Sequence, residues 1–155
     1  MTTNKTLKVL IVNESPTFRY DVMAMLANRN FQFHQAGSGI RAIQSALTNH
    51  PDIILVNSVL PDMSGIECLV RIKQNARAEK TRVIMTRPIV RAGQADDLLE
   101  QARHLGCNDF VTIPIVPPAL ERRIEKLERI VRDSHMAKSA RETMTHITLP
   151  RRILL

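Results

Sequence analysis

Residues 51–67, PDIILVNSVLPDMSGIE, carry the clearest signal of the fold. The four consecutive aliphatic residues, Ile53 to Val56, are typical of a strand buried on both faces in the middle of a parallel sheet. The proline, serine and glycine residues that follow predict a loop, and helical spacing resumes at Ile66.

Similar short aliphatic runs recur on both sides of this stretch, with helical patterns between them. The five predicted strands are 8–12, 31–35, 52–56, 82–86 and 110–113. Alternation of strands and helices is the usual sign of βαβ units around a parallel sheet, so the sequence predicts an α/β protein.

Five helices are predicted from apolar residues at helical spacing. Ser15 and Pro16 form an N-cap and first-turn pair for the first helix, and Pro51 must end the second. Gly106 closes the fourth, and Pro118 is expected at the first position of the fifth. The apolar stripes are Phe18, Val22, Met25 and Leu26; Ile40, Ile43 and Leu47; Ile66, Leu69, Val70 and Ile72; Leu98, Leu99, Ala102 and Leu105; and Leu120, Ile124, Leu127 and Val131.

The last stripe fades beyond Val131, because Ser134, Lys138 and Arg141 fall where apolar residues are needed. We therefore expect one domain over residues 1–133. Residues 134–155 are expected to form a basic C-terminal tail or linker, either helical or flexible.

The composition fits a globular chain of 155 residues with a net charge of +7. Its two cysteines stand apart and its five histidines show no ligand spacing, so no metal site or disulfide framework is predicted. No apolar run reaches the length of a membrane span and no signal-peptide core is present, so we expect a cytoplasmic protein without a membrane partner.

Residues 51–67 resemble the response-regulator receiver family, whose phosphoacceptor aspartate ends the third strand and precedes a loop of the form L-P-x-M-x-G. The resemblance extends from Lys8 to about Val131. It implies a doubly wound, flavodoxin-like (βα)5 fold with a five-stranded parallel sheet in the order 2-1-3-4-5. It also implies a pocket at the carboxyl ends of the strands, and a cis bond between Ile113 and Pro114, where the family has Lys-Pro.

The resemblance implies chemistry from which this sequence departs. Receivers hold Mg²⁺ with acidic residues after strand one, and they contact the phosphoryl group with a hydroxyl after strand four and a lysine after strand five. Here Asn57 occupies the acceptor position, and an amide cannot form an acyl phosphate. The other positions of this degenerate pocket hold Asn13 and Glu14 (acidic pair), Arg87 or the preceding Thr86 (hydroxyl) and Ile113 (lysine). We expect a pseudo-receiver with no catalytic residues, no cofactor, and Mg²⁺ binding that is lost or weak.

Simpler structural roles are open to the same residues. The Asn57 amide could bond only to the following loop. Arg87 could reach the pocket and pair with Glu14, or lie exposed before Pro88. Phe110, at the position of the family's switch aromatic, is expected to pack in the core.

Most of the surplus charge lies in residues 71–91, which carry a net charge of +6. These residues could form one exposed patch or only a solvated face. No aromatic residues interleave with them and no DNA-reading module fits the tail, which argues against nucleic acid as the partner. The basic residues are Arg71, Lys73, Arg77, Lys80, Arg82, Arg87 and Arg91.

A second charge pattern links the predicted fourth and fifth helices, because the fourth is acidic and the fifth basic. In receivers the face made by helix four, strand five and helix five commonly mediates dimers, so a homodimer with crossed charges is possible. The residues concerned are Asp96, Asp97 and Glu100, and Arg122, Arg123 and Lys126.

Together these features predict a response-regulator-like signalling protein, not an enzyme. It is expected to act by phosphorylation-independent protein–protein interaction in a two-component-type pathway. One alternative is binding of nucleic acid or an acidic partner through residues 71–91 and the tail. Another is that the chain is the receiver portion of a longer regulator.

Overall fold

The computed structural model describes the backbone of residues 5–89 and 95–153, and the side chains of residues 5–89 and 97–145. Its centre is a five-stranded, wholly parallel sheet in the order β2-β1-β3-β4-β5, as the resemblance implied. The strands are β1 (Leu7–Val12), β2 (Phe31–Ala36), β3 (Ile53–Asn57), β4 (Arg82–Pro88) and β5 (Asp109–Ile113).

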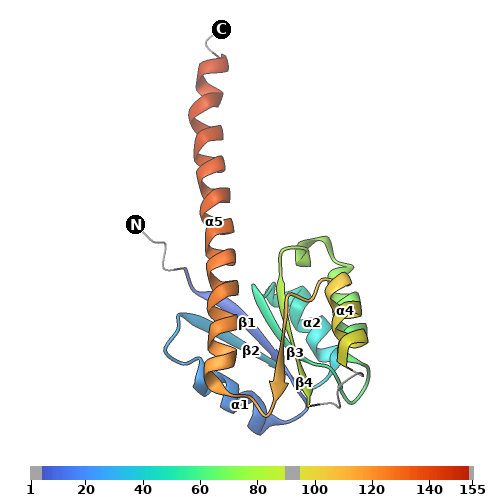
Figure 1. Cartoon of the computed structure of the whole chain (residues 1–155). Helices are drawn as coiled ribbons and strands as arrows, with labels where there is room; N and C mark the ends of the chain where they lie inside the picture. The colour runs from blue at the N-terminus through green and yellow to red at the C-terminus, as the bar shows by residue number, and fades with distance from the viewer. Residues whose placement is uncertain (1–4, 90–94, 154–155) are drawn as a thin grey trace.

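Helices connect and cover the strands (Figure 1). They are α1 (Pro16–Met25), α2 (Gly39–Asn49), α3 (Gly65–Lys73), the short 3-10 helix η1 (Ala76–Ala78), α4 (Ala95–His104) and α5 (Pro117–Ile153). The Ser15 hydroxyl accepts a hydrogen bond from the Phe18 N–H at 3.2 Å, which confirms the predicted N-cap of α1. Helix α5 begins one residue before the predicted Pro118.

Two apolar layers lie on opposite faces of the sheet. One packs the sheet against α1 and α5, and the other packs it against α2, α3 and α4. Strand β3 contributes Ile53 and Leu55 to the first layer and Ile54 and Val56 to the second, so the central strand is buried on both faces as predicted.

The predicted apolar stripe of α2 is wrong at two of its three positions. Ile40 and Leu47 are 54% and 51% exposed, whereas Ala42 and Ala46 are buried. The reason is close packing, because α2 lies directly against α3, β1 and β2. Where a helix approaches its neighbours this closely, small side chains form the contact face.

Helix α5 docks through the predicted stripe and then continues past the domain. Leu120, Ile124, Leu127 and Val131 are all buried, whereas residues 136–145 are exposed. The helix remains regular to Ile153, so the helical form of the predicted tail is the one observed. It runs antiparallel to the strands and projects beyond their amino ends (Figure 1).

Candidate functional site

The carboxyl ends of the strands bring the predicted pocket residues to one edge of the sheet. Asn13 follows β1, Asn57 ends β3, and Ile113 ends β5. Asn57 is the register partner of Thr86 on β4. A parallel sheet places these strand ends together because every strand runs in the same direction.

Both polar ends of the Asn57 amide are engaged. Its Nδ2 donates to the Val59 carbonyl at 2.9 Å, and its Oδ1 accepts from the Thr86 hydroxyl at 3.2 Å. Thr86 is fully buried and Asn57 is partly buried, so this second bond is partly shielded from water. The expected bond from Asn57 to the following loop is therefore present, and Thr86 is the residue that adds a hydroxyl contact.

Arg87 has a contact that the sequence did not indicate. Its guanidinium carbon lies 5.9 Å from the centre of the Phe110 ring, within the range of a cation–π interaction. Phe110 itself is buried in the apolar layer beneath α2, α3 and α4, as predicted.

Hydrogen bonds within the protein hold the loop after β1 in place. Asn13 is buried, and its Oδ1 accepts from the Ser15 N–H at 2.9 Å, whereas Glu14 is exposed. Arg19 was missed at the sequence level, although its Nη1 donates to the Asn13 carbonyl at 2.6 Å and its Nε to Gln35 at 3.0 Å. No spacing or motif in α1 marks Arg19 for this role.

The L-P-x-M-x-G loop is a structural device that fixes the end of β3. The Asp62 carboxylate accepts from the Gly39 and Ile40 N–H groups at 2.8 and 2.9 Å, and these two bonds hold its pKa below the usual value. A Cβ added to Gly65 would lie 2.3 Å from the Asn57 carbonyl oxygen, so only glycine fits. The motif predicted this loop, but not that Asp62 caps α2.

The β5 side of the edge is apolar. Ile113 is partly buried beside the cis bond to Pro114, and it lines a cavity of about 230 Å³ between α1 and the loop after β5. Val59, Ile89 and Val116, which we call the apolar rim, are 67%, 74% and 61% exposed. The rim lies in the segments that follow β3, β4 and β5.

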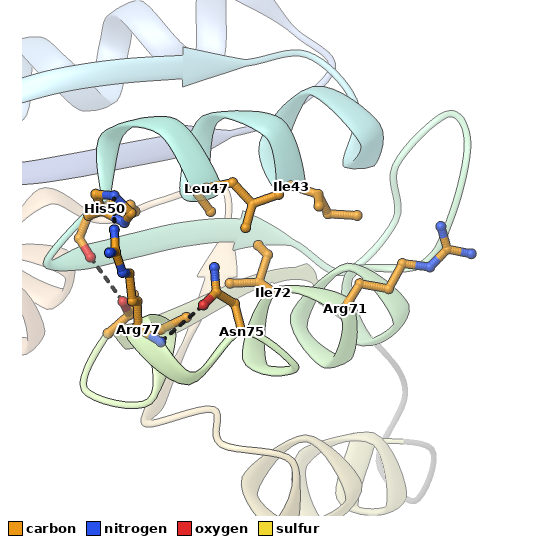
Figure 2. A pocket seen from close by; sticks show the side chains of 11 residues that line it. Ile43, Leu47, His50, Arg71, Ile72, Asn75 and Arg77 are labelled. Carbon is orange, nitrogen blue, oxygen red and sulfur yellow. Dashed lines mark hydrogen bonds between the residues drawn. The ribbon is translucent and has the colours of Figure 1, made fainter.

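The basic segment does not form one patch. Arg71 pairs with Glu67 at 2.8 Å. A small pocket lies between α2 and the α3–η1 segment, and Figure 2 shows Arg71 and Arg77 at its opposite ends, with Arg71 pointing away. The half-buried Lys73 ammonium donates to the Ala78 and Thr81 carbonyls, and burial lowers its pKa. Arg77, Lys80 and Arg82 lie before or at the start of β4, whereas Arg87 lies near its end. Arg91 lies outside the described residues.

The charges proposed for a homodimer are only partly available. Arg122 and Lys126 are exposed on α5, and Asp97 and Glu100 are exposed on α4. Arg123 is already paired with Asp109 at 3.4 Å. The side chain of Asp96 lies outside the described residues.

The described residues contain neither a candidate metal centre nor a candidate membrane span. No group of three or more histidine, cysteine, aspartate or glutamate side chains is placed to hold a metal ion in that part of the chain. Among the described helices, none is both long and apolar enough to cross a bilayer.

Comparison with known families agrees with this fold. The "Response regulator receiver domain" family matches residues 9–125, and the chain belongs to it. It is thus a receiver domain of the class that works in two-component signalling, where receivers interact with other proteins.

Among similar curated proteins is Protein PilH of Pseudomonas aeruginosa, with 27% identity over 76% of this chain and 93% of PilH. The two-component response regulator-like APRR7 of Arabidopsis thaliana is 31% identical over 72% of this chain and 15% of that protein. The transcriptional regulatory protein SrrA of Staphylococcus aureus is 24% identical over 85% of this chain. The chain spans about half of SrrA, at 52%, and a small part of APRR7.

Solved structures share the fold. The chemotaxis protein CheY4 of Vibrio cholerae superposes with a TM-score of 0.71 at 20% identity, covering 79% of this chain and 99% of CheY4. The response regulator domain of Thermotoga maritima CheB gives a TM-score of 0.68 at 25% identity, covering 82% and 97%.

Proposed function

We propose that this receiver domain is a pseudo-receiver that signals by phosphorylation-independent protein–protein interaction in a two-component-type pathway, and that it is not an enzyme. The observation that carries the proposal is the Asn57 amide at the end of β3, whose two polar ends are satisfied by Val59 and Thr86. A neutral amide has no carboxylate oxygen to attack phosphorus, so no acyl phosphate forms there.

The oxygen donors around Asn57 do not fit Mg²⁺. A hard divalent cation favours clustered carboxylates, and the predicted positions offer one, Glu14, which is exposed. The amide oxygens of Asn13 and Asn57 already accept hydrogen bonds from the protein. We therefore propose that Mg²⁺ binding is lost or weak and that the domain needs no cofactor.

The apolar rim supports a protein as the partner. Exposed apolar residues on neighbouring segments at one edge of a sheet are candidates for a protein interface when they form a contiguous patch. Val59, Ile89 and Val116 follow three of the strands whose carboxyl ends form this edge, and Ile113 ends β5 at the position where the family has a lysine. A cytoplasmic partner protein that binds this edge needs no phosphoryl group to recognise.

The first experiment tests phosphorylation directly. The protein is incubated with acetyl phosphate and Mg²⁺, beside a receiver that retains the aspartate, and both are followed by intact mass and by NMR. The mass and the spectrum of this protein are expected to stay unchanged while the control is modified. A Mg²⁺-dependent phosphoryl adduct in the pocket contradicts the proposal.

The second experiment tests the interaction edge. Partners are captured from extracts of the source cell by the wild type, by Val59→Glu/Val116→Glu, and by Tyr20→Glu as a control. Tyr20 is 62% exposed on α1, outside the rim. Capture is expected to be lost only in the rim variant and to be independent of acetyl phosphate. Capture that requires the phosphodonor, or equal loss in both variants, contradicts the proposal.

The homodimer remains a separate proposal for the face formed by α4, β5 and α5. Light scattering of the wild type is compared with Arg122→Glu/Lys126→Glu and with that variant carrying Asp97→Lys/Glu100→Lys as well. A dimer that dissociates on the first change and returns on the second supports the crossed-charge interface. A wild type that stays monomeric at high concentration contradicts it.

The chain could also be the receiver portion of a longer regulator, a proposal supported by SrrA, of which it spans about half. An immunoblot of the native protein tests this by its size. A band near 17.6 kDa contradicts it.

A further inference from the structure

At the edge of the sheet opposite the receiver pocket, the structure brings together two basic segments that are far apart in the sequence. A cavity of about 310 Å³ lies between α5 and the residues that begin β3 and β4. Its charged or imidazole-bearing lining residues are His50, Asp52, Arg77, Lys80, Arg82, His135 and Lys138. We call this cavity the basic groove.

The carboxylate in the lining does not neutralise the groove. Asp52 accepts from the Lys8 N–H at 2.8 Å through Oδ2, and its Oδ1 lies 3.5 Å from Nε2 of His135. Arg77, Lys80, Arg82 and Lys138 form no ion pair within the described part of the chain. The groove therefore holds an excess of positive charge that its own walls leave uncompensated.

Two buried polar atoms in these walls also lack hydrogen-bond partners within the described residues. They are Nε of Arg82 and Nδ1 of His135. Of these two atoms, the Arg82 Nε–H is a donor in every protonation state of the groove, and a buried donor without an acceptor is unfavourable. An anion beside the Arg82 guanidinium would form charge-assisted hydrogen bonds with it.

The groove is built before any ligand arrives. The Lys73 ammonium, which donates to the carbonyls of Ala78 and Thr81, holds the turn that carries Lys80 and Arg82. The opposite wall is α5, anchored by the buried Val131. A rigid, preorganised pocket loses less entropy on binding than a mobile one.

The residues that line the groove indicate which class of ligand it can bind. A second cavity, of about 390 Å³, shares Lys80 and Lys138 with the first and is otherwise lined by Arg141, Glu142 and Thr145 of α5, so its three cations outnumber its one carboxylate. An elongated groove of this size and charge suits a small anion with several charges close together. The lining of both cavities contains no phenylalanine or tyrosine on which a base could stack, so the phosphate chain is the part recognised.

We propose that the basic groove, between the start of β4 and α5, binds a small oligophosphate, a ligand with two or more linked phosphate groups. The inference is independent of the proposed function, because the groove and the receiver pocket lie at opposite edges of the sheet. The ligand is either a free oligophosphate or the phosphate chain of a nucleotide.

Isothermal titration calorimetry of the full chain at two salt concentrations tests the proposal. The probes are orthophosphate, pyrophosphate, tripolyphosphate and ATP, with a single-stranded oligonucleotide and a glutamate-rich peptide as competing classes. We expect saturable binding of tripolyphosphate, tighter than orthophosphate and weaker at high salt. ATP that binds as tightly as tripolyphosphate identifies the phosphate chain as sufficient, and ATP that binds more tightly identifies a nucleotide as the source.

Matched variants locate the site. Lys80→Gln/Lys138→Gln removes two exposed cations from the groove, and Arg122→Gln/Lys126→Gln removes two exposed cations from α5 outside it. The groove variant is expected to bind tripolyphosphate roughly tenfold or more weakly, and the control within about twofold of the wild type. Arg82→Gln is a third variant, whose affinity for tripolyphosphate tests a residue in the wall of the groove. Its melting temperature is measured in parallel to check that it is folded.

Three results overturn the proposal. They are no saturable binding of tripolyphosphate by the wild type, equal losses in the groove variant and the control, and tighter binding of the oligonucleotide or the peptide than of tripolyphosphate. The second result means that net charge alone attracts the anion.

Discussion

Gly65→Ala tests whether the loop after β3 holds Asn57 in place by close contact. The added Cβ lies 2.3 Å from the Asn57 carbonyl oxygen and 2.9 Å from the Ser58 Cα, and both neighbours are backbone atoms. Ordinary contacts at a Cβ begin near 3.4 Å, so the backbone has to move by about 1 Å. That shift also strains the bond from the Gly65 N–H to the Ser58 carbonyl, which measures 2.8 Å.

The size of the effect follows from three contributions. Overpacking costs about 1–3 kcal/mol, and a weakened backbone hydrogen bond costs about 1 kcal/mol. Alanine regains about 0.5–1 kcal/mol over glycine within a helix. The free energy of unfolding is therefore expected to fall by about 1–3.5 kcal/mol, a drop in melting temperature of roughly 2–14 °C for a chain of this size.

Gly39→Ala is the matched control, because Gly39 also follows a serine N-cap at the start of a helix. There the added Cβ meets the Met63 side chain, whose flexible end can turn aside. Urea unfolding followed by circular dichroism is expected to give a loss below about 1 kcal/mol. The reasoning is refuted if Gly65→Ala unfolds like the wild type, or if the two variants lose the same stability.

Three further predictions concern the rest of the molecule. Glu128→Gln, which removes a carboxylate with two arginine partners at 3.5 and 3.6 Å, is expected to cost about 0.5–1 kcal/mol. Glu125→Gln, which removes a carboxylate with one exposed arginine partner, is expected to cost less. Urea unfolding at low and high salt measures both free energies of unfolding, and equal losses in the two variants contradict this prediction. Burial raises the pKa of Cys68 to about 12 and that of Cys107 to about 11, so thiolate forms only as the pH approaches those values. At pH 8 both thiols should resist a disulfide reagent until the chain is unfolded, and rapid reaction of the native protein contradicts this. Leu127→Ala is expected to lower the free energy of unfolding by about 2–5 kcal/mol in the same urea assay, and a loss below 1 kcal/mol means that α5 is not docked as described.

The strand order and most buried helix faces could be predicted because buried positions recur in the sequence as regularly spaced apolar residues. In α5 the four apolar positions match the buried ones. In α2 the trace was ambiguous, because Ile40 and Ala42 both begin stripes with helical spacing. Periodicity does not reveal how closely two elements approach, and it is close approach that selects alanine at the contact with α3 and the sheet.

The site was predicted as a set of residue types but not as a set of bonds. Sequence placed Asn57 at the strand end, yet its bond to Thr86 depends on the β3–β4 register. The Arg19 contacts and the Asp62 cap join segments separated by loops, and no local pattern records them. The basic groove could not be predicted from the sequence for the same reason, because its two walls lie about fifty residues apart in the chain.

The long α5 gives this domain mechanical reach as well as a docked face. Its 37 residues make a rod of about 55 Å, of which about 33 Å lies beyond Val131. Each residue turns an α-helix by about 100°. The helix therefore fixes both the distance from the domain and the rotation about the helix axis of any partner bound to its far half. Inserting one residue beyond Val131 would rotate such a partner about the helix axis by more than a quarter turn. Inserting seven residues would lengthen the helix by about 10 Å and nearly restore the partner's original orientation.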